Sequence, residues 1–263
     1  MMALPRNIQM TKIRLLSDLH MEGFPFDYIH KGEDILVLAG DIHTKGRHSV
    51  LLDQVPESVQ VLLVAGNHEF YGSYYQDAML ELAYFESRYP NVFFLNNSTF
   101  ETKDLAFYGG TMYSDFALMP NRLKSYVQAN AAVSINDFFQ IRKRTDDGMN
   151  AFWKTTDHLE EHKKFKKGLS KFLTKKKNNK KKIVVSHFMP HPALIDEQYR
   201  GSILNAYFCS DMSKYMGFDG YWFYGHTHSS GDIMIGDTRV IGNPRGYGDE
   251  NIEGFDPNLI VEI

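Results

Sequence analysis

Side chains that can bind a metal recur along this chain in short clusters. Asp18 and His20 are one residue apart, so in an extended segment both side chains project from the same face. His226 and His228 repeat that spacing near the C-terminus, and Asn67 offers an amide oxygen. Carboxylate oxygens and imidazole nitrogens bind hard and borderline divalent cations. The clusters therefore predict a metal centre with the candidate residues Asp18, His20, Asp41, Asn67, His68, His187, His226 and His228.

Each cluster follows a short apolar run with the composition of a buried strand. Residues 13–16, 35–39 and 61–65 are rich in leucine, valine and isoleucine and end at polar or turn-forming residues. Residues 183–185 and 221–224 precede the last two clusters in the same way. The pattern indicates a layered α/β domain with its chemistry at the carboxyl ends of strands. Further strands are predicted at residues 92–95, 105–108, 232–235 and 238–241, with a hairpin turn at Gly236-Asp237.

Taken singly, each cluster could be an ordinary surface feature. An Asp-x-His triplet such as the one at Asp18 is common as a turn carboxylate beside a surface imidazole. Asp41 follows Gly40 and can be an ordinary turn aspartate, and a His-x-His pair occurs on protein surfaces as well as in metal sites. The stronger observation is the order of all the clusters, each at the end of a predicted strand. Chance does not readily assemble that series.

The clusters closely resemble the motifs of the calcineurin-like metallophosphoesterase superfamily. They read Asp18-Leu19-His20, Gly40-Asp41, Gly66-Asn67-His68-Glu69, Ser186-His187 and Gly225-His226-Thr227-His228. Residues 110–116 and 243–247 also look like a microbial and phage branch, so the resemblance covers nearly the whole chain. It implies an α/β fold, a four-layer αββα sandwich of two mixed sheets, in a single domain of residues 1–263.

The same resemblance implies a site for two divalent cations. Asp18, His20, Asp41 and His228 would hold the first cation, and Asp41, Asn67, His187 and His226 would hold the second, which makes Asp41 the bridge. Two cations can clamp a phosphate and lower the pKa of a bridging water, giving a hydroxide that attacks in line. His68 is then expected to protonate the leaving oxygen or stabilise charge on the phosphate. Nitrogen and oxygen ligands suit Mn, Fe, Zn, Co or Ni without choosing among them.

The expected substrate is a phosphate ester, with a phosphodiester favoured and nucleotides among the candidates. A phosphomonoesterase or protein phosphatase, a nuclease, and a metal-binding interaction scaffold without activity stay open as alternatives. Arg245, in Asn243-Pro244-Arg245-Gly246-Tyr247, is a candidate phosphate contact because a guanidinium matches phosphate oxygens, although it can equally be a surface ion-pair residue. Glu69 is expected to orient its loop.

Two histidines near the motifs are expected not to be ligands. His191 lies between prolines that fix its flanks away from the strand, and the family ligand in the motif of His43 is Asp41. Many relatives have two adjacent histidines where this chain has His187-Phe188, so only one imidazole is available there.

Residues 115–182 differ in character from the rest. Long polar stretches with spaced apolar residues predict a mainly helical insertion that covers the sheet edge or the mouth of the site. The insertion ends in a lysine-rich tract, residues 175–182. A solvated loop after a helix C-terminus is the expected structure of that tract, and a contact surface for phosphate backbones is the alternative.

Composition excludes several other classes of protein. Cys209 is the only cysteine, so neither an intramolecular disulfide nor a thiolate zinc site can form, and a reducing cytosolic location is expected. No apolar run approaches the ~20 residues of a membrane helix, so no membrane partner is expected. A net charge of -3 does not favour a nucleic acid partner.

Overall fold

The structure, a computed structural model, describes residues 10–175 and 179–263. Its strands are β1 (Lys12–Leu16), β2 (Ile35–Ala39), β3 (Gln60–Val64), β4 (Val92–Phe94), β5 (Ser98–Glu101), β6 (Leu105–Gly110), β7 (Arg142–Arg144), β8 (Asn150–Phe152), β9 (Lys181–Ser186), β10 (Gly220–Tyr224), β11 (Gly231–Ile235), β12 (Thr238–Gly242) and β13 (Ile260–Glu262). The α-helices are α1 (Ser49–Leu52), α2 (Tyr75–Arg88), α3 (Lys124–Ser134), α4 (Asp137–Gln140), α5 (Thr155–Thr174) and α6 (Asn205–Phe208). Single 3-10 turns lie at His68–Phe70, Asn121–Leu123, Pro192–Leu194, Glu197–Tyr199 and Ser213–Tyr215.

Two mixed sheets form the body of the fold. The first has the strand order β13-β1-β2-β3-β4, in which β1 to β4 run parallel and β13 is antiparallel to β1. The second has the order β11-β12-β10-β9-β6-β5, in which the four central strands run parallel and both edge strands are antiparallel. Since parallel strands share their carboxyl end, each sheet collects the loops that follow its central strands at one edge.

The two sheets pack face to face through alternating side chains. In β1 and β2, Leu15 and Val37 belong to a buried cluster shared with Phe107 and Val185 of the second sheet. Their neighbours in the chain, such as Leu38, point the other way into the cluster that includes the helices. Both faces of these strands are therefore buried, which explains why their sequences are continuously apolar rather than alternating.

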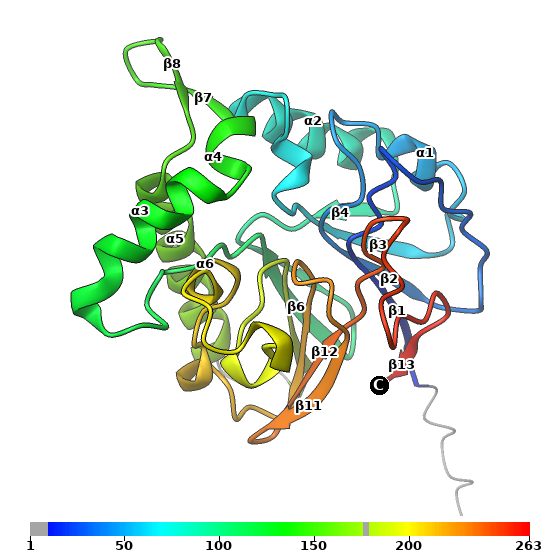
Figure 1. Cartoon of the computed structure of the whole chain (residues 1–263). Helices are drawn as coiled ribbons and strands as arrows, with labels where there is room; N and C mark the ends of the chain where they lie inside the picture. The colour runs from blue at the N-terminus through cyan, green and yellow to red at the C-terminus, as the bar shows by residue number, and fades with distance from the viewer. Residues whose placement is uncertain (1–9, 176–178) are drawn as a thin grey trace, which may run out of the picture.

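Helices cover the outer faces of the sandwich, with α1 and α2 beside the first sheet and α3 to α5 beside the second (Figure 1). Helix α5 buries His158, His162, Phe165, Leu169 and Phe172, at the spacing of one helical face. Phe165 packs against Tyr108 of β6, with 5.1 Å between ring centroids. The expected fold class, two mixed sheets covered by helices, is confirmed.

The predicted strands are all present, each within two residues of its predicted limits. The hairpin at Gly236-Asp237 is also confirmed, since β11 and β12 pair antiparallel around a Gly236 with φ of +59°. Strands β5 and β13 were not predicted. Both are edge strands of only four and three residues, too short to show a strand pattern, so their pairing depends on a neighbour that local sequence does not reveal.

The segment between β6 and β9, which includes most of the range 115–182 where a mainly helical insertion is expected, contains α3, α4 and α5. It also contains the β7–β8 hairpin, which the sequence did not predict because Arg142-Lys143-Arg144 has no apolar face. The last residues of the expected range, from Lys181 onward, already belong to strand β9.

The described residues of the lysine-rich tract lie at the amino end of β9, opposite the strand ends that carry the metal-binding motifs. Lys175 and Lys180 both contact the carboxylate of Glu101, at 3.0 and 2.8 Å. Residues 176–178 of the tract lie outside the described residues. The part described is therefore an ion-paired surface away from the motifs. Within the described residues, no helix is both long and apolar enough to cross a membrane.

Candidate metal centre and active site

The predicted site residues come together where the carboxyl ends of both sheets meet. Loops after β1, β2 and β3 bring residues from the first sheet, and loops after β9 and β10 bring residues from the second. Asp18 ties the two sheets together, because its carboxylate accepts a hydrogen bond from the backbone N–H of His226 at 3.0 Å. Ser17 and Pro244 form a parallel β-bridge beside it. The site therefore depends on the packing of one sheet against the other.

The backbone at this site is unusual. Asp18, His20, Asp41, His226 and His228 all have positive φ, between 43° and 76°. Left-handed backbone costs an ordinary L-residue ~1–2 kcal/mol, and aspartate and histidine tolerate it better than most. Such conformations persist only where the surroundings enforce them, and they cluster at functional sites. The turns that end these strands thus aim short polar side chains back over the strand ends.

Three glycines of the motifs make room for the ligand loops. A Cβ at Gly40 would collide with His187 Nδ1 and the backbone of Gly66. A Cβ at Gly66 would collide with the carboxylate of Asp41, and one at Gly225 would lie 2.5 Å from the carboxylate of Asp18. Only glycine fits at these three positions, because neighbouring ligand loops approach the backbone too closely for a Cβ atom. This explains the glycines of the Gly-Asp, Gly-Asn-His and Gly-His motifs.

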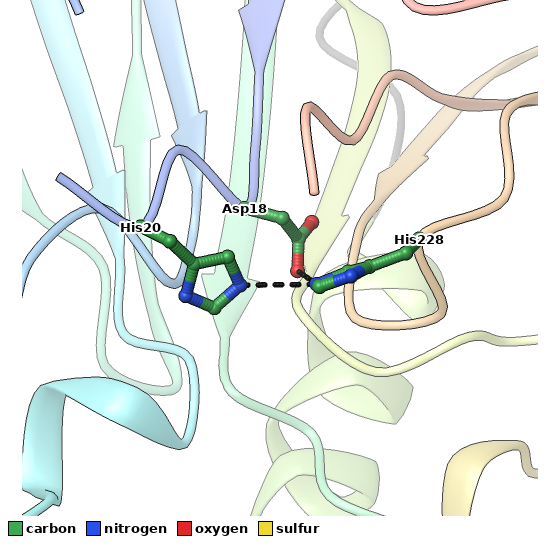
Figure 2. Close-up of side chains that lie close together, drawn as sticks. All are labelled: Asp18, His20 and His228. Atoms are coloured by element: carbon green, nitrogen blue, oxygen red, sulfur yellow. Dashed lines mark hydrogen bonds and ion pairs between the residues drawn. The ribbon is translucent and has the colours of Figure 1, made fainter. Parts of the chain in front are cut away.

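Asp18, His20 and His228 form the first group that could hold a cation. The Nε2 atoms of His20 and His228 are 3.0 Å apart, and His228 Nε2 lies 3.6 Å from a carboxylate oxygen of Asp18. Figure 2 shows these three side chains converging from the loop after β1 and from the loop after β10. Asp41 is also near, with its Oδ2 atom 3.8 Å from His20 Nε2.

Asp41, His187 and His226 form a second such group. His187 Nε2 lies 3.4 Å from Asp41 Oδ2 and 3.1 Å from the amide oxygen of Asn67. The other nitrogen of His187, Nδ1, donates to the backbone carbonyl of Ala39 at 2.9 Å, which leaves Nε2 directed at the site. Asp41 Oδ2 thus faces both groups.

The donor atoms are spaced as ligands of a shared cation would be. Two ligands that each lie about 2.1 Å from one cation, at about 90–110°, are separated by about 3.0–3.4 Å, close to the spacings observed. Buried imidazole nitrogens normally have a hydrogen-bond partner, but Nε2 of His226 is buried and has none. Imidazole nitrogens with carboxylate and amide oxygens, and no thiolate, are suitable ligands for first-row divalent metals. The residues present therefore fit metal binding.

The pKa values of the aspartates and histidines at this site depend strongly on one another. Burial alone would lower the pKa of His187, but the carboxylates of Asp41 and Asp18 raise it to about 10. Burial would raise the pKa of Asp41, yet the imidazoles of His187 and His68 hold it well below its usual range. Burial and the neighbouring His187 lower the pKa of His226. The carboxylates thus favour positive charge on the imidazoles that surround them.

Three glutamates, none of them a predicted ligand, orient the site. Glu250 accepts from Nδ1 of His228 at 2.6 Å, which directs Nε2 of that ring inward. Glu22 lies 3.3 and 3.2 Å from the Nδ1 atoms of His20 and His68. Glu69 accepts from the backbone N–H groups of residues 41, 42 and 66, so it orients the loops as expected. Partners of this kind fix the tautomer and direction of metal-binding side chains.

Asn67 is oriented by a residue from the helical segment. Its Nδ2 donates to the carboxylate of Asp137 in α4 at 2.8 Å, so its amide oxygen must face His187. Asp137 also accepts from the hydroxyls of Tyr71 and Tyr207, at 2.8 and 2.5 Å, and is fully buried. Burial raises the pKa of Asp137, and the three donors partly oppose that shift by stabilising the carboxylate.

His68 lies at the rim of the site, where together with His20 and Asp41 it forms a third group of side chains that could hold a cation. Its Nε2 is 4.0 Å from Asp41 Oδ2 and 3.2 Å from the hydroxyl of Tyr247, and its ring stacks on Tyr71 at 4.1 Å. Burial would lower its pKa, but the carboxylates of Asp41 and Glu22 raise it to about 9. The imidazole is therefore held in place and can carry a proton.

Three further residues considered from the sequence lie elsewhere. The guanidinium of Arg245 donates to the backbone carbonyls of residues 19, 24 and 25, each at 3.0 Å, and it does not line the cavity beside the site. This geometry gives no support to a phosphate contact. His43 Nδ1 lies 3.0 Å from the carbonyl of Thr44, and His191 accepts from the N–H of Ala193. Neither histidine belongs to the groups of described residues that could bind a metal.

A comparison with protein families decides the identity of this fold and site. The profile described as calcineurin-like phosphoesterase matches residues 11–230. The chain belongs to that family. It is accordingly a metal-dependent phosphoesterase, an enzyme that hydrolyses phosphoric ester bonds.

Relatives of this phosphoesterase are distant in sequence. "Uncharacterized protein L509" of Acanthamoeba polyphaga mimivirus is 25% identical over 281 residues, covering 95% of this chain and 96% of its own. Among solved structures, a phosphopantetheinyl hydrolase from Mycobacterium tuberculosis has a TM-score of 0.71 at 14% identity, covering 97% of this chain and 96% of its own. At that identity the likeness concerns the fold.

Proposed function

We propose that this phosphoesterase hydrolyses phosphodiesters at a centre of two divalent cations. The observation that carries the proposal is the convergence of seven candidate ligands from five strand ends, with the Oδ2 atom of Asp41 within 4 Å of both His20 and His187. The ligands would be Asp18, His20, Asp41 and His228 for one cation and Asp41, Asn67, His187 and His226 for the other. Bound there, such a pair neutralises the charge of the phosphate and makes water acidic enough to supply a nucleophile at neutral pH.

The protein's own contribution is to hold these donors in place before substrate arrives. Glu250 and the carbonyl of Ala39 fix the rings of His228 and His187, and Asp137 fixes the amide of Asn67. The donor set is compatible with Mn, Fe, Zn, Co or Ni, and we use Mn as the test ion.

His68 is the proposed proton donor to the leaving oxygen. It stands next to the candidate ligand Asn67, is partly exposed toward the cavity, and carries a proton at neutral pH because Asp41 and Glu22 raise its pKa. Glu22 and Tyr247 hold the ring on either side, so the donor is oriented rather than free. A positioned imidazole of this kind contributes ~10²–10⁴-fold to rate.

Charge around the site favours a diester over a monoester. Among the described residues, no lysine or arginine lines the cavity at the site. A monoester dianion would therefore bring a second negative charge with no lysine or arginine to meet it, whereas a diester carries one negative charge. Nucleic acid is less favoured for the same reason, since binding a polyanion needs a row of cations.

The test is a comparison of matched aryl esters. Bis(4-nitrophenyl) phosphate and 4-nitrophenyl phosphate are incubated with the Mn-loaded protein, with a chelator control and with Asp41→Ala. We expect the diester to be turned over with the higher kcat/KM, and both the chelator and the substitution to abolish turnover. Wild-type activity in Asp41→Ala would contradict the bridging role, and a higher kcat/KM for the monoester would reverse the assigned preference.

A further inference from the structure

A cavity of about 480 Å³ opens directly beside the candidate metal centre. Asp41, Asn67, His68, His226 and His228 form one side of it. The opposite side comes from the chain between β9 and β10, including the loop after β9 and helix α6. A space of this size accommodates a small organic group. Whatever is attached to a phosphate at the metal centre must therefore enter this cavity or point to solvent.

The far wall of the cavity is largely apolar. Met189, Ile195, Leu204 and Phe208 line it, with the polar side chains of Tyr199, Ser202 and Asn205 beside them. Phe208 also packs against the ring of His226 at 5.2 Å between centroids. Phe208 and Ile195 belong to the layer that packs on the hydrophobic core, so this wall is backed by buried side chains. Water held against such a wall is released when an apolar group replaces it, which favours binding.

The charged side chains of this cavity, apart from Asp41 and the histidines, are acidic. Asp196 accepts from the backbone N–H of Gln198, and Glu250 accepts from His228. None of the described lysines or arginines is part of the lining, and the nearby Arg245 is turned toward backbone carbonyls. A second anionic group on the substrate would meet carboxylates instead of a counterion.

From this wall and this charge pattern we propose that the cavity takes the uncharged, mainly apolar group of the ester. This inference rests on the proposed function of the centre, and it narrows the substrate to phosphoesters whose only negative charge is on the reacting phosphate. Nucleoside polyphosphates and oligonucleotides fall outside that class, and so do esters with an acidic substituent near the phosphate.

Simple phosphonates test the cavity without relying on turnover. Methylphosphonate, hexylphosphonate and 6-phosphonohexanoate present the same head group to the metals, and each has only one substituent to place. Dissociation constants are measured by calorimetry on the Mn-loaded protein. Each buried methylene contributes about fourfold to affinity, so burial of half of the five added methylenes predicts hexylphosphonate to bind at least ~10-fold tighter than methylphosphonate. The carboxylated compound is expected to bind at least ~10-fold more weakly than hexylphosphonate.

A substitution in the apolar wall tests whether the substituent of the phosphonate binds there. Leu204→Lys places a cation in the cavity and should weaken hexylphosphonate while strengthening 6-phosphonohexanoate. Leu80→Lys is the matched control, because Leu80 lies on α2, is 72% exposed, and does not line this cavity. The control should leave all three constants unchanged.

Two results overturn the inference: equal affinity for methyl- and hexylphosphonate, or a carboxylated compound that binds as tightly as hexylphosphonate. Neither result depends on whether diesters are hydrolysed. A protein that shows the alkyl preference but turns over no diester would refute the proposed function and retain the cavity assignment.

Discussion

Replacing Asp137 by alanine is expected to weaken metal binding although the residue touches no metal site directly. Asp137 is the acceptor that holds the Nδ2 atom of Asn67 at 2.8 Å, and the amide oxygen faces His187 only while that bond exists. Without it the amide can turn and present its N–H₂ group to the cation. Loss of partners that orient metal ligands typically costs ~10–100-fold in metal affinity.

The same substitution has a cost in stability that can be worked from the structure. Three donors, from Asn67, Tyr71 and Tyr207, lose a common buried acceptor. Each buried donor left without a partner costs ~1–3 kcal/mol, and removing one member of a buried charged network costs ~3–5 kcal/mol in all. Globular proteins have ~5–15 kcal/mol of stability, so the variant should fold with a lowered melting temperature.

Two further variants separate orientation from stability. Asp137→Asn keeps an acceptor for Asn67 and should recover most of the metal affinity. Tyr207→Phe removes one donor to the carboxylate but leaves the Asn67 contact, so it should lose ~1 kcal/mol of stability with no change in metal affinity. The assay is calorimetric titration with Mn, together with thermal unfolding of each variant. Unaltered Mn affinity in Asp137→Ala would refute the orienting role.

Three other outcomes are expected. His68→Asn should lower kcat on the diester by ~10²–10⁴-fold while Mn affinity stays near wild type, and an equal loss of both would show that His68 belongs with the ligands. Metal binding at pH 7.5 should release a proton, because without metal the carboxylates of Asp41 and Asp18 help to raise the pKa of His187 to about 10. Calorimetric titration in two buffers of different ionisation enthalpy measures the number of protons released. The release should vanish in His187→Ala. Glu33→Gln breaks the buried ion pair in which a carboxylate oxygen of Glu33 lies 3.1 Å from the guanidinium of Arg14. This substitution should lower the free energy of unfolding by ~3–5 kcal/mol at pH 7. Burial would raise the pKa of Glu33, but the hydroxyl of Tyr28, backbone N–H groups and the guanidinium lower it overall, so its contribution is present above its ordinary pKa of ~4.3 and is lost as the pH falls further. Urea unfolding should therefore show a smaller difference in unfolding free energy between Glu33→Gln and wild type at pH 3 than at pH 7, and a constant difference would contradict the pair's role.

Much of the fold could be predicted because its strands are buried on both faces. Residues 35–39, for example, match β2 in both limits, since a short, continuous apolar run between polar turns is typical of a strand in the middle of a covered sheet. The β7–β8 hairpin could not be predicted in this way. Its strands read Arg-Lys-Arg and Asn-Ala-Phe, and two of the arginines rest on the ring of Tyr74 at 4.9 and 4.4 Å rather than in a core.

The candidate ligands were found from sequence because each belongs to a short motif at a strand end. Their supporting residues were not. Glu22 had a signal, since it follows His20 at the same spacing that joins Asp18 to His20. Asp137 had none, because an aspartate after an asparagine is typical of a helix start. Its role depends on how α4 packs against the loop after β3, across 70 residues of sequence.

The site forms where ligands from the sequence motifs meet the residues that orient them. Asp18 and Asp41 come from one sheet and the histidines at 187, 226 and 228 from the other, so the ligand groups exist only when the two sheets are packed. The left-handed turns at Asp18, His20, Asp41, His226 and His228 are enforced by that packing, through contacts such as the bond from the N–H of His226 to Asp18. Glycine-lined strand ends allow the approach, and glutamates together with an aspartate from the helical segment set the direction of each donor. The motifs thus specify which atoms could bind a metal, whereas the sandwich and its insertion determine whether those atoms point at the same place.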